Sequence, residues 1–281
     1  MTTDTPQEFN NIQPGASKHR SLWLKKLIRE HGLALVFFVG VILLWEVYVR
    51  AAKVPVYVLP APSVILQAMI KESNEMLKHA WFTLYEVIVG FLIGTAIGIP
   101  LAIAIVYSKF IEKTIYAFLV ASQAIPKVAL APLLIAWFSF GMTPKIIITT
   151  LMCFFPIVVN TVIGLSSTPP EMLYLARSLG ASGFETFWKF RFPHGLPSIF
   201  GGLKVATSLA VVGAVVGEFV AGVNGLGYLQ MIRAAFVRTA SVFAILVYLS
   251  VLGIALFNLI GYIEKRVIRW DPRRQLERTQ E

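Results

Sequence analysis

Charged residues and cysteine are both scarce in this 281-residue chain, and each shortage excludes a class of protein. Charged residues make up 14% of the sequence, whereas about a quarter is usual in a soluble domain. Cys153 is the single cysteine, so no disulfide can form within the chain. The composition therefore argues against a soluble domain and against one stabilised by internal disulfides.

Clusters of residues that could catalyse a reaction or bind a metal ion are also lacking in the sequence. The four histidines, His19, His31, His79 and His194, are scattered and show no metal-ligand spacing. The chain has no Gly-x4-Gly-Lys-Ser/Thr loop, so we do not expect it to hydrolyse a nucleotide by itself. A membrane-embedded enzyme would need clustered His, Asp, Glu or Cys near its apolar segments. We therefore expect no catalytic residue, no metal and no cofactor on this chain.

What the sequence does contain is hydrophobic residues, which make up 57% of it and give a mean hydropathy of +0.72. Each long apolar segment can cross about 30 Å of hydrocarbon as a helix. The sequence therefore predicts an all-α integral membrane protein, with a membrane-spanning domain over 33–263 between basic tails at 1–32 and 264–281. Six transmembrane helices are predicted near 33–49, 83–107, 115–139, 146–164, 198–221 and 242–263.

The net charge of +10 could indicate either nucleic-acid binding or basic cytoplasmic loops. Its distribution favours the second alternative. With the N-terminus inside, sixteen of the 25 lysines and arginines fall in inner segments and seven in outer ones. Both termini are therefore predicted to be cytoplasmic, and no nucleic-acid partner is expected.

A polar, charged and aromatic stretch of about 165–197 separates the fourth and fifth apolar segments. Thr168 and Glu171 predict a capping box at the start of a short helix, which Gly180 would end as a left-handed cap. Ser182 and Glu185 predict a second capping box, two residues after that glycine. The stretch is therefore predicted to form two short helices on the cytoplasmic side.

The second short helix is rich in aromatic residues, and Pro193 and Pro197 are predicted to stop it before the fifth span. Three interpretations remain for the pair of helices. They could lie against the membrane or their own bundle, dock a cytoplasmic partner, or form a nucleic-acid helix-turn-helix. The last is disfavoured because the helices are short and tethered to membrane at both ends.

The segment ARSLGASGFETFWKFRFPHGLP resembles the cytoplasmic loop of binding-protein-dependent ABC importer permeases, which has the pattern Glu-Ala-Ala-x3-Gly-x9-Ile-x-Leu-Pro. Gly180 matches the glycine, Ala176 matches the second alanine, and 190–193 match Ile-x-Leu-Pro conservatively. Tyr174 and Leu175 stand in place of Glu-Ala, and Glu171 lies one turn earlier. The segments VLPAPSVILQAM, IPKVALAPLLIAWFSFGMTPKI and GEFVAGVNGLGYLQ are similar to parts of the nitrate/sulfonate/taurine and vitamin-precursor subgroup.

The resemblance implies a type I ABC importer permease fold in a bacterial inner membrane. It implies a homodimer of permeases, each docking one cytoplasmic ATPase through 168–193, and an extracytoplasmic solute-binding protein. ATP and Mg²⁺ would be bound by the ATPase. The solute would be a small anion such as nitrate, sulfonate or taurine, or a vitamin precursor. The implied ATPase-coupling residues are Glu171, Leu175, Ala176, Arg177, Gly180, Ala181, Phe184, Phe187 and Pro193.

The third span carries the residues that suggest a solute pathway. Pro126 and Pro132 each remove a backbone donor there, and an interrupted helix is tolerated mainly where it lines a cavity or is buried in protein. Lys127 would suit an anionic solute, or it could snorkel or pack on nearby carbonyls. Glu218 could line the outer gate, contact the loop around Asn224, or be a hydrated interfacial carboxylate. The predicted pathway residues are Ser122, Gln123, Lys127 and Glu218.

Glycines at four-residue spacing predict close helix packing in the second and fifth spans. These are Gly90, Gly94, Gly98, Gly213 and Gly217. The main alternative to an importer subunit is a self-sufficient secondary carrier or channel. Inverted repeats and a relay of ionisable residues across several spans would favour it, and the sequence shows no convincing repeat.

Overall fold

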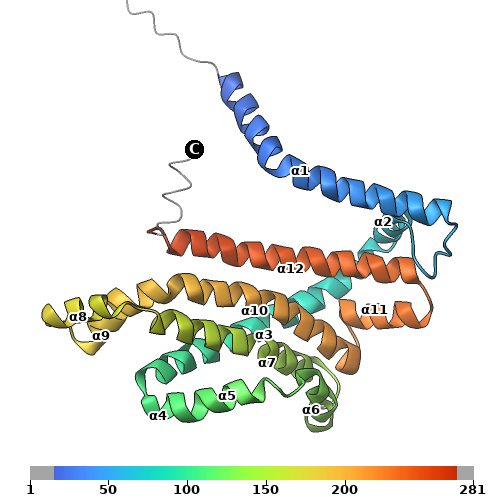
Figure 1. Ribbon diagram of the computed structural model, residues 1–281. Helices are drawn as coiled ribbons and strands as arrows, with labels where there is room; N and C mark the ends of the chain where they lie inside the picture. The colour runs from blue at the N-terminus through green and yellow to red at the C-terminus, as the bar shows by residue number, and fades with distance from the viewer. Residues whose placement is uncertain (1–15, 271–281) are drawn as a thin grey trace, which may run out of the picture. The chain divides into compact units, whose positions relative to one another are not determined.

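The computed structural model describes residues 16–270, which are helical with short connections and contain no strand (Figure 1). The chain divides into two units, Met1–Ser63 and Val64–Glu281. The first fifteen residues of the predicted N-terminal tail and the last eleven of the predicted C-terminal tail lie outside the described residues. The all-α prediction is confirmed.

The described part of the first unit is dominated by α1 (Ala16–Ala51), which contains the predicted span 33–49. Near its end, the Glu46 carboxylate accepts hydrogen bonds from Arg50 Nε at 2.6 Å and from Ser63 N at 3.0 Å. Ser63 is the last residue of this unit and lies in the first turn of α2 (Pro62–Lys71).

The second unit is built on helices that pack lengthwise against one another. In Figure 1, α12, α10 and α7 run side by side, and α7 also packs along α3. The short helix α11 lies against α3, α10 and α12. These helices are α3 (Ser73–Tyr107), α7 (Met142–Ser166), α10 (Phe192–Ala221), α11 (Leu226–Ala235) and α12 (Thr239–Val267).

Glycines allow α7 to approach both of its main neighbours closely. A Cβ atom built at Gly90 of α3 would lie 2.5 Å from Thr149 Cγ2, and one at Gly213 of α10 would lie 2.8 Å from Thr149 Cα. Such distances are too short for real side chains, so the helix backbones meet where Cβ is absent. The other members of the two glycine stripes, Gly94, Gly98 and Gly217, likewise face Cys153, Ile157 and Lys145 of α7.

Four helices of the described residues are long and apolar enough to cross a membrane. They are α3, α7, the continuous run Gly183–Ala221 and α12. A fifth crossing results if the bent pair Lys109–Ser122 and Lys127–Phe138 counts as one span. The first predicted span, 33–49 within α1, stays a prediction.

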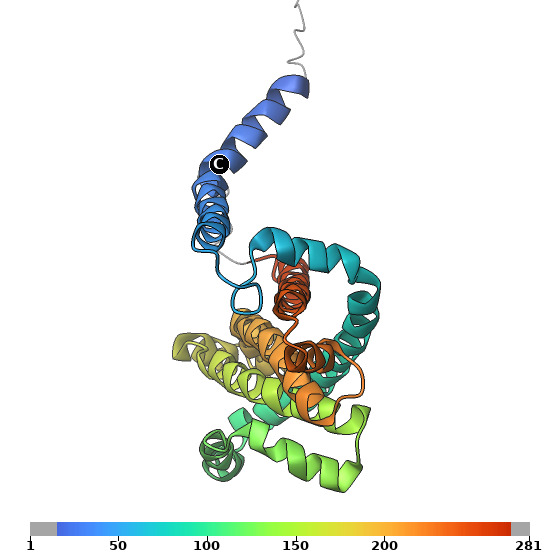
Figure 2. The same cartoon turned by 90° about the vertical axis from the view of Figure 1, so that its right-hand side faces the viewer.

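The predicted third span, 115–139, is not one straight helix. Its two halves meet at 87° after a break at residues 123–126, and in Figure 2 the green pieces run in different directions. Pro126 is extended at φ −64° and ψ 104°, which interrupts the helical hydrogen bonding. The pieces are α4 (Lys109–Ile111), η1 (Glu112–Tyr116), α5 (Ala117–Ser122), η2 (Lys127–Leu130) and α6 (Ala131–Phe138).

The predicted stop at Pro193 and Pro197 is wrong. The helix α9 (Gly183–Thr186) continues through the π-helical turn η3 (Phe187–Arg191) directly into α10. Pro193 lies in the first turn of α10, and the wider π-helical turn before it accommodates the lost backbone donor. The second short helix is therefore rigidly continuous with a membrane span.

Candidate functional site

The cytoplasmic stretch predicted from sequence forms α8 (Pro170–Ser178), then a tight turn, then α9. Gly180 has φ +72°, and its N–H donates to Arg177 O at 3.0 Å. The Ala181 N–H donates to Ala176 O, also at 3.0 Å. This is the hydrogen-bond pattern of a Schellman motif, and it confirms the left-handed cap predicted at Gly180.

Only one of the two predicted capping boxes exists. Thr168 does not cap α8, because its Oγ1 is buried and donates back to Leu165 O at 3.3 Å, and Pro169 occupies the N-cap position. Ser182 does cap α9: its Oγ accepts from Glu185 N at 3.2 Å, and its N–H donates to Glu185 Oε2 at 3.0 Å. The bend between α8 and α9 is therefore fixed by local bonds on both sides.

The predicted coupling residues divide into an outward and an inward set. Phe184 is 73% exposed, and Leu175 is also exposed. In contrast, Ala176 and Phe187 are buried. Phe187 packs edge-on against Tyr107 at the end of α3, with ring centroids 5.8 Å apart. The remaining members, Glu171, Arg177 and Gly180, are exposed, and Ala181 and Pro193 are half-buried.

An apolar hollow of about 430 Å³ lies between the end of α3 and the α9–η3 segment. It is lined by Ile103, Tyr107, Gly183, Phe184, Phe187 and Trp188. The inward aromatic residues therefore attach the segment to the bundle, while the outward residues are left for another surface to cover.

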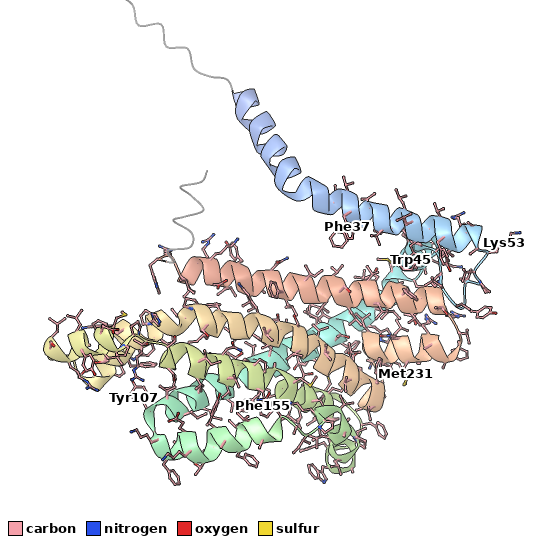
Figure 3. The ribbon with its side chains drawn as sticks, in the orientation of Figure 1. Phe37, Trp45, Lys53, Tyr107, Phe155 and Met231 are labelled. Atoms are coloured by element: carbon pink, nitrogen blue, oxygen red, sulfur yellow. The ribbon has the colours of Figure 1, made fainter. Side chains whose placement is uncertain are left out.

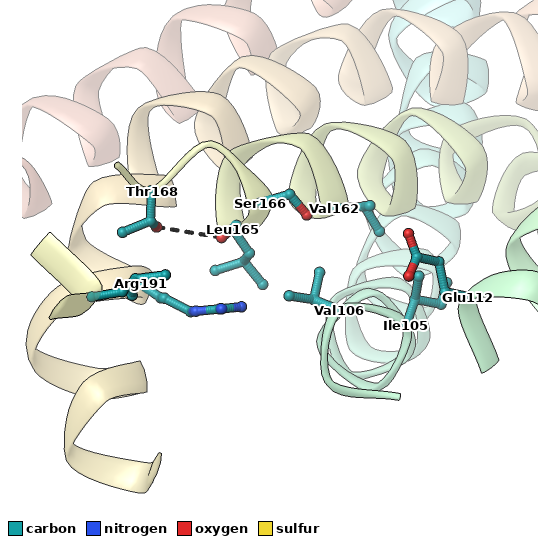
Figure 4. A pocket seen from close by; sticks show the side chains of 9 residues that line it. Ile105, Val106, Glu112, Val162, Leu165, Ser166, Thr168 and Arg191 are labelled. Carbon is teal, nitrogen blue, oxygen red and sulfur yellow. Dashed lines mark hydrogen bonds between the residues drawn. The ribbon is translucent and has the colours of Figure 1, made fainter. Parts of the chain in front are cut away.

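A second cavity of about 230 Å³ lies where the end of α3, η1, α7, α8 and η3 meet (Figure 4). Arg191 from η3 and Glu112 from η1 line it from opposite sides. The Arg191 guanidinium also lies over the Tyr107 ring, 5.7 Å from its centroid. A displacement of η3 would therefore change the contacts of both α3 and the first half of the bent pair.

Three of the predicted pathway residues lie together at the break of the bent pair. The Lys127 ammonium lies 4.5 Å from the ring centroid of Phe155 of α7, which Figure 3 labels. Ser122 Oγ donates to Leu119 O at 2.7 Å, and Gln123 is exposed. The break therefore brings one cation and polar groups to the surface that α7 and the bent pair share.

The fourth, Glu218, belongs to a different group, which lies at the other end of the helices from α8 and α9. We call Thr83, Glu86, Lys145 and Glu218 the buried polar cluster, because all four are almost wholly buried. The Lys145 ammonium forms an ion pair with Glu86 and donates to Asn224 O at 3.2 Å. Thr83 Oγ1 donates to Glu218 Oε1 at 2.6 Å.

The turn that leads into α11 closes the cluster with its backbone N–H groups. Gly227 N donates to Glu218, Leu226 N donates to Thr83 Oγ1 at 2.8 Å, and Gly225 N donates to His79 Nδ1 at 3.0 Å. The interpretation of Glu218 as a hydrated interfacial carboxylate is wrong, since the residue is fully buried. Its predicted contact with the loop around Asn224 is confirmed.

Sequence reasoning missed Glu86 and Lys145. Lys145 was assigned to an outer segment, yet it is a buried residue of the first turn of α7. Glu86 falls inside the predicted span 83–107, where an ionisable residue is by default a candidate functional group. That signal could have identified Glu86, but its partner lies 59 residues away in the chain.

Residues 94–269 match the family described as "Binding-protein-dependent transport system inner membrane component". A "Probable ABC transporter permease protein" of Haemophilus influenzae is 35% identical over 83% of this chain and 96% of its own. "Formylaminopyrimidine transport permease protein ThiX" of Halalkalibacterium halodurans is 36% identical over 84% and 94%. "Putative aliphatic sulfonates transport permease protein SsuC" of Bacillus subtilis is 30% identical over 95% and 94%.

Among solved structures, the inward-facing MetNI methionine ABC transporter matches with a TM-score of 0.59. The match covers 71% of this chain and 97% of that one, at 20% identity, and it bears on the fold alone. The chain belongs to the family of binding-protein-dependent transport system inner membrane components. It is an ABC transporter permease subunit with the type I fold, as its sequence motifs predicted.

Proposed function

We propose that this permease docks a cytoplasmic ATPase through 168–193 and, with a second permease chain, forms the passage of an importer. The observation that carries the proposal is the division of the α8–α9 segment into an anchored inner face and an exposed outer face. Phe187 is held against Tyr107, whereas Leu175 and Phe184 project outward. An exposed apolar group on a rigid, capped element is suited to insertion into a partner's groove.

The continuous helix from α9 into α10 supplies the coupling. When ATP draws two ATPases together, a displacement at Phe184 would pass through η3 into the α10 span without a flexible joint. The ATPase binds the ATP and Mg²⁺, and this chain transmits the displacement to its membrane spans. Both termini would be cytoplasmic, in a bacterial inner membrane, and a solute-binding protein would deliver solute at the outer face.

The solute is proposed to be a small anion, such as nitrate, a sulfonate or taurine, or a vitamin precursor. Lys127 supports an anion, because a cation at the break of a span can compensate an anionic group away from bulk water. A relative named for aliphatic sulfonates and another named for formylaminopyrimidine fit these two classes. We expect Lys127→Met to abolish uptake of an anionic solute in vesicles, and Lys113→Met in the η1 turn to leave it intact.

The docking proposal is tested by co-purification from mild-detergent membranes. Phe184→Asp is compared with Phe110→Asp, because the two phenylalanines are 73% and 76% exposed and both lie on the predicted cytoplasmic side. An ATPase should copurify with the wild type and with Phe110→Asp, and be lost with Phe184→Asp. If Phe184→Asp retains the ATPase, the segment is not the docking element. If no ATPase copurifies and the purified chain alone moves solute, the secondary-carrier alternative holds.

A further inference from the structure

The buried polar cluster contains more carboxyl groups than cations. The ionisable groups that face one another are Glu86 from α3, Lys145 from α7 and Glu218 from α10, and the 224–227 turn adds none. His79 borders the cluster through its bond to Gly225 N. With both carboxyl groups ionised, the enclosed space would hold two negative charges against one positive charge. An uncompensated charge away from water is unfavourable by far more than an ordinary contact.

One carboxylate oxygen of the cluster also lacks a donor. Glu86 Oε1 is bound to Lys145, but Glu86 Oε2 is buried and has no hydrogen-bond partner among residues 16–270. Glu218 reaches α3 at Thr83, three residues before Glu86, but as a carboxylate it could only accept. A proton on the pair would neutralise the excess charge and supply the missing donor.

We propose that Glu86 and Glu218 share one proton, carried by Glu218, and that this neutralised pair holds α3, α7, α10 and the 224–227 turn together. Glu86 is assigned the charge because it contacts the Lys145 ammonium directly. A protonated Glu218 still accepts from Thr83 and from Gly227 N, because each carboxyl oxygen retains an acceptor site. The hydrogen bonds of Glu218 are then kept, and the charges of Glu86 and Lys145 balance.

The arrangement makes Glu218 a positioning residue at this end of the permease. Its carboxyl group bonds α3 through Thr83 and the turn through Gly227, while Lys145 connects α7 to Glu86 and to Asn224. The turn approaches Glu218 so closely that a Cβ at Gly225 would lie 2.0 Å from Glu218 Oε1. Three spans and the start of α11 therefore form one body at the end opposite α8 and α9.

Infrared spectroscopy of the purified full-length permease in lipid nanodiscs at pH 7.5 tests this inference, and it requires no ATPase or solute. We expect a C=O stretching band of a protonated carboxylic acid that shifts in D2O. It should be present in the wild type and absent in Glu218→Gln. The matched control is Glu264→Gln, since Glu264 is ion-paired with Lys204 and 20% exposed at its side chain. The control should retain the band.

A second variant keeps the inference testable if Glu218→Gln fails to fold. Thr83→Val preserves the shape of Thr83 but removes the hydroxyl group that donates to Glu218, so the band should shift in frequency. The inference is overturned if the wild type shows no such band, if the band persists unchanged in Glu218→Gln, or if Thr83→Val leaves its frequency unaltered.

Discussion

The two ends of this permease hold their geometry by different physical means. At the end formed by α8 and α9, which we call the coupling end after its proposed role, the bend is fixed by bonds within a few residues, such as the Gly180 turn and the Ser182–Glu185 capping box. At the opposite end, the buried polar cluster depends on bonds between residues far apart in the chain, such as Glu86–Lys145 at 59 positions and Thr83–Glu218 at 135. A substitution at the coupling end therefore removes one local bond, whereas a substitution in the buried polar cluster leaves another buried group without its partner.

The largest expected effect is therefore in the cluster. Lys145→Met leaves Glu86 buried without its cation, and we expect a loss of about 3–5 kcal/mol in stability because an unpaired buried charge is so costly. The measurement is thermal unfolding in detergent, followed by size-exclusion chromatography. The double variant Glu86→Gln/Lys145→Met should recover most of the loss, because it removes both charges.

The control for that comparison is an ion pair at the coupling end. Lys189→Met breaks the exposed pair with Glu185, and we expect no measurable change in unfolding temperature. Equal losses for Lys145→Met and Lys189→Met would contradict the distinction between the two ends.

Glycines at the two ends provide the next comparison. Gly180→Ala places a side chain at φ +72° where no atom lies within 4 Å, so we expect only the conformational cost of about 1–2 kcal/mol. Gly225→Ala combines φ +117° with a clash against Glu218, so a larger loss is expected. Thermal unfolding of both variants measures the difference.

Gly183→Ala is the matched control, because Gly183 has neither a positive φ nor a neighbour within 4 Å. It should unfold like the wild type. If Gly180→Ala is as destabilising as Gly225→Ala, the cluster does not restrict the turn before α11 as the structure indicates.

The smallest expected effect is local to the coupling end. Ser182→Ala removes the side-chain acceptor of the Glu185 N–H, which should weaken the start of α9 by about 1 kcal/mol. We expect faster limited proteolysis within 179–186 and an unchanged global unfolding temperature. Ser178→Ala, which removes a hydroxyl group bonded only within α8, is the control and should not change the proteolysis rate. A large drop in unfolding temperature with Ser182→Ala would show that the cap stabilises more than the start of α9.

The accuracy of the sequence predictions also differs between features set by local bonds and features set by the surrounding structure. Gly180 and the Ser182–Glu185 box were predicted correctly, because both are set by residues within five positions of each other. The Thr168 cap was predicted wrongly, because the buried Thr168 hydroxyl bonds back to Leu165 of α7 and not forward to α8. Both choices are local, and the sequence pattern did not show which one the hydroxyl would take.

The third span shows an intermediate case. Pro126 allowed the sequence to predict an interruption, but the angle of 87° depends on what each half packs against. The same holds for the passage from α9 into α10, where a π-helical turn keeps the helix continuous despite Pro193. A proline indicates where a helix can be interrupted. The packing around the proline determines whether the helix breaks or continues.

The sequence by itself determined the membrane class, the apolar segments, the coupling motif and the family, because hydropathy and short-range caps are properties of contiguous residues. Only the tertiary structure decided that Glu86, Lys145 and Glu218 meet. Each is a single ionisable residue in or beside an apolar segment, and whether it is hydrated, paired or protonated depends on which spans pack together. The glycine faces of α3 and α10 bring those spans onto α7, and that packing removes water from the three ionisable groups.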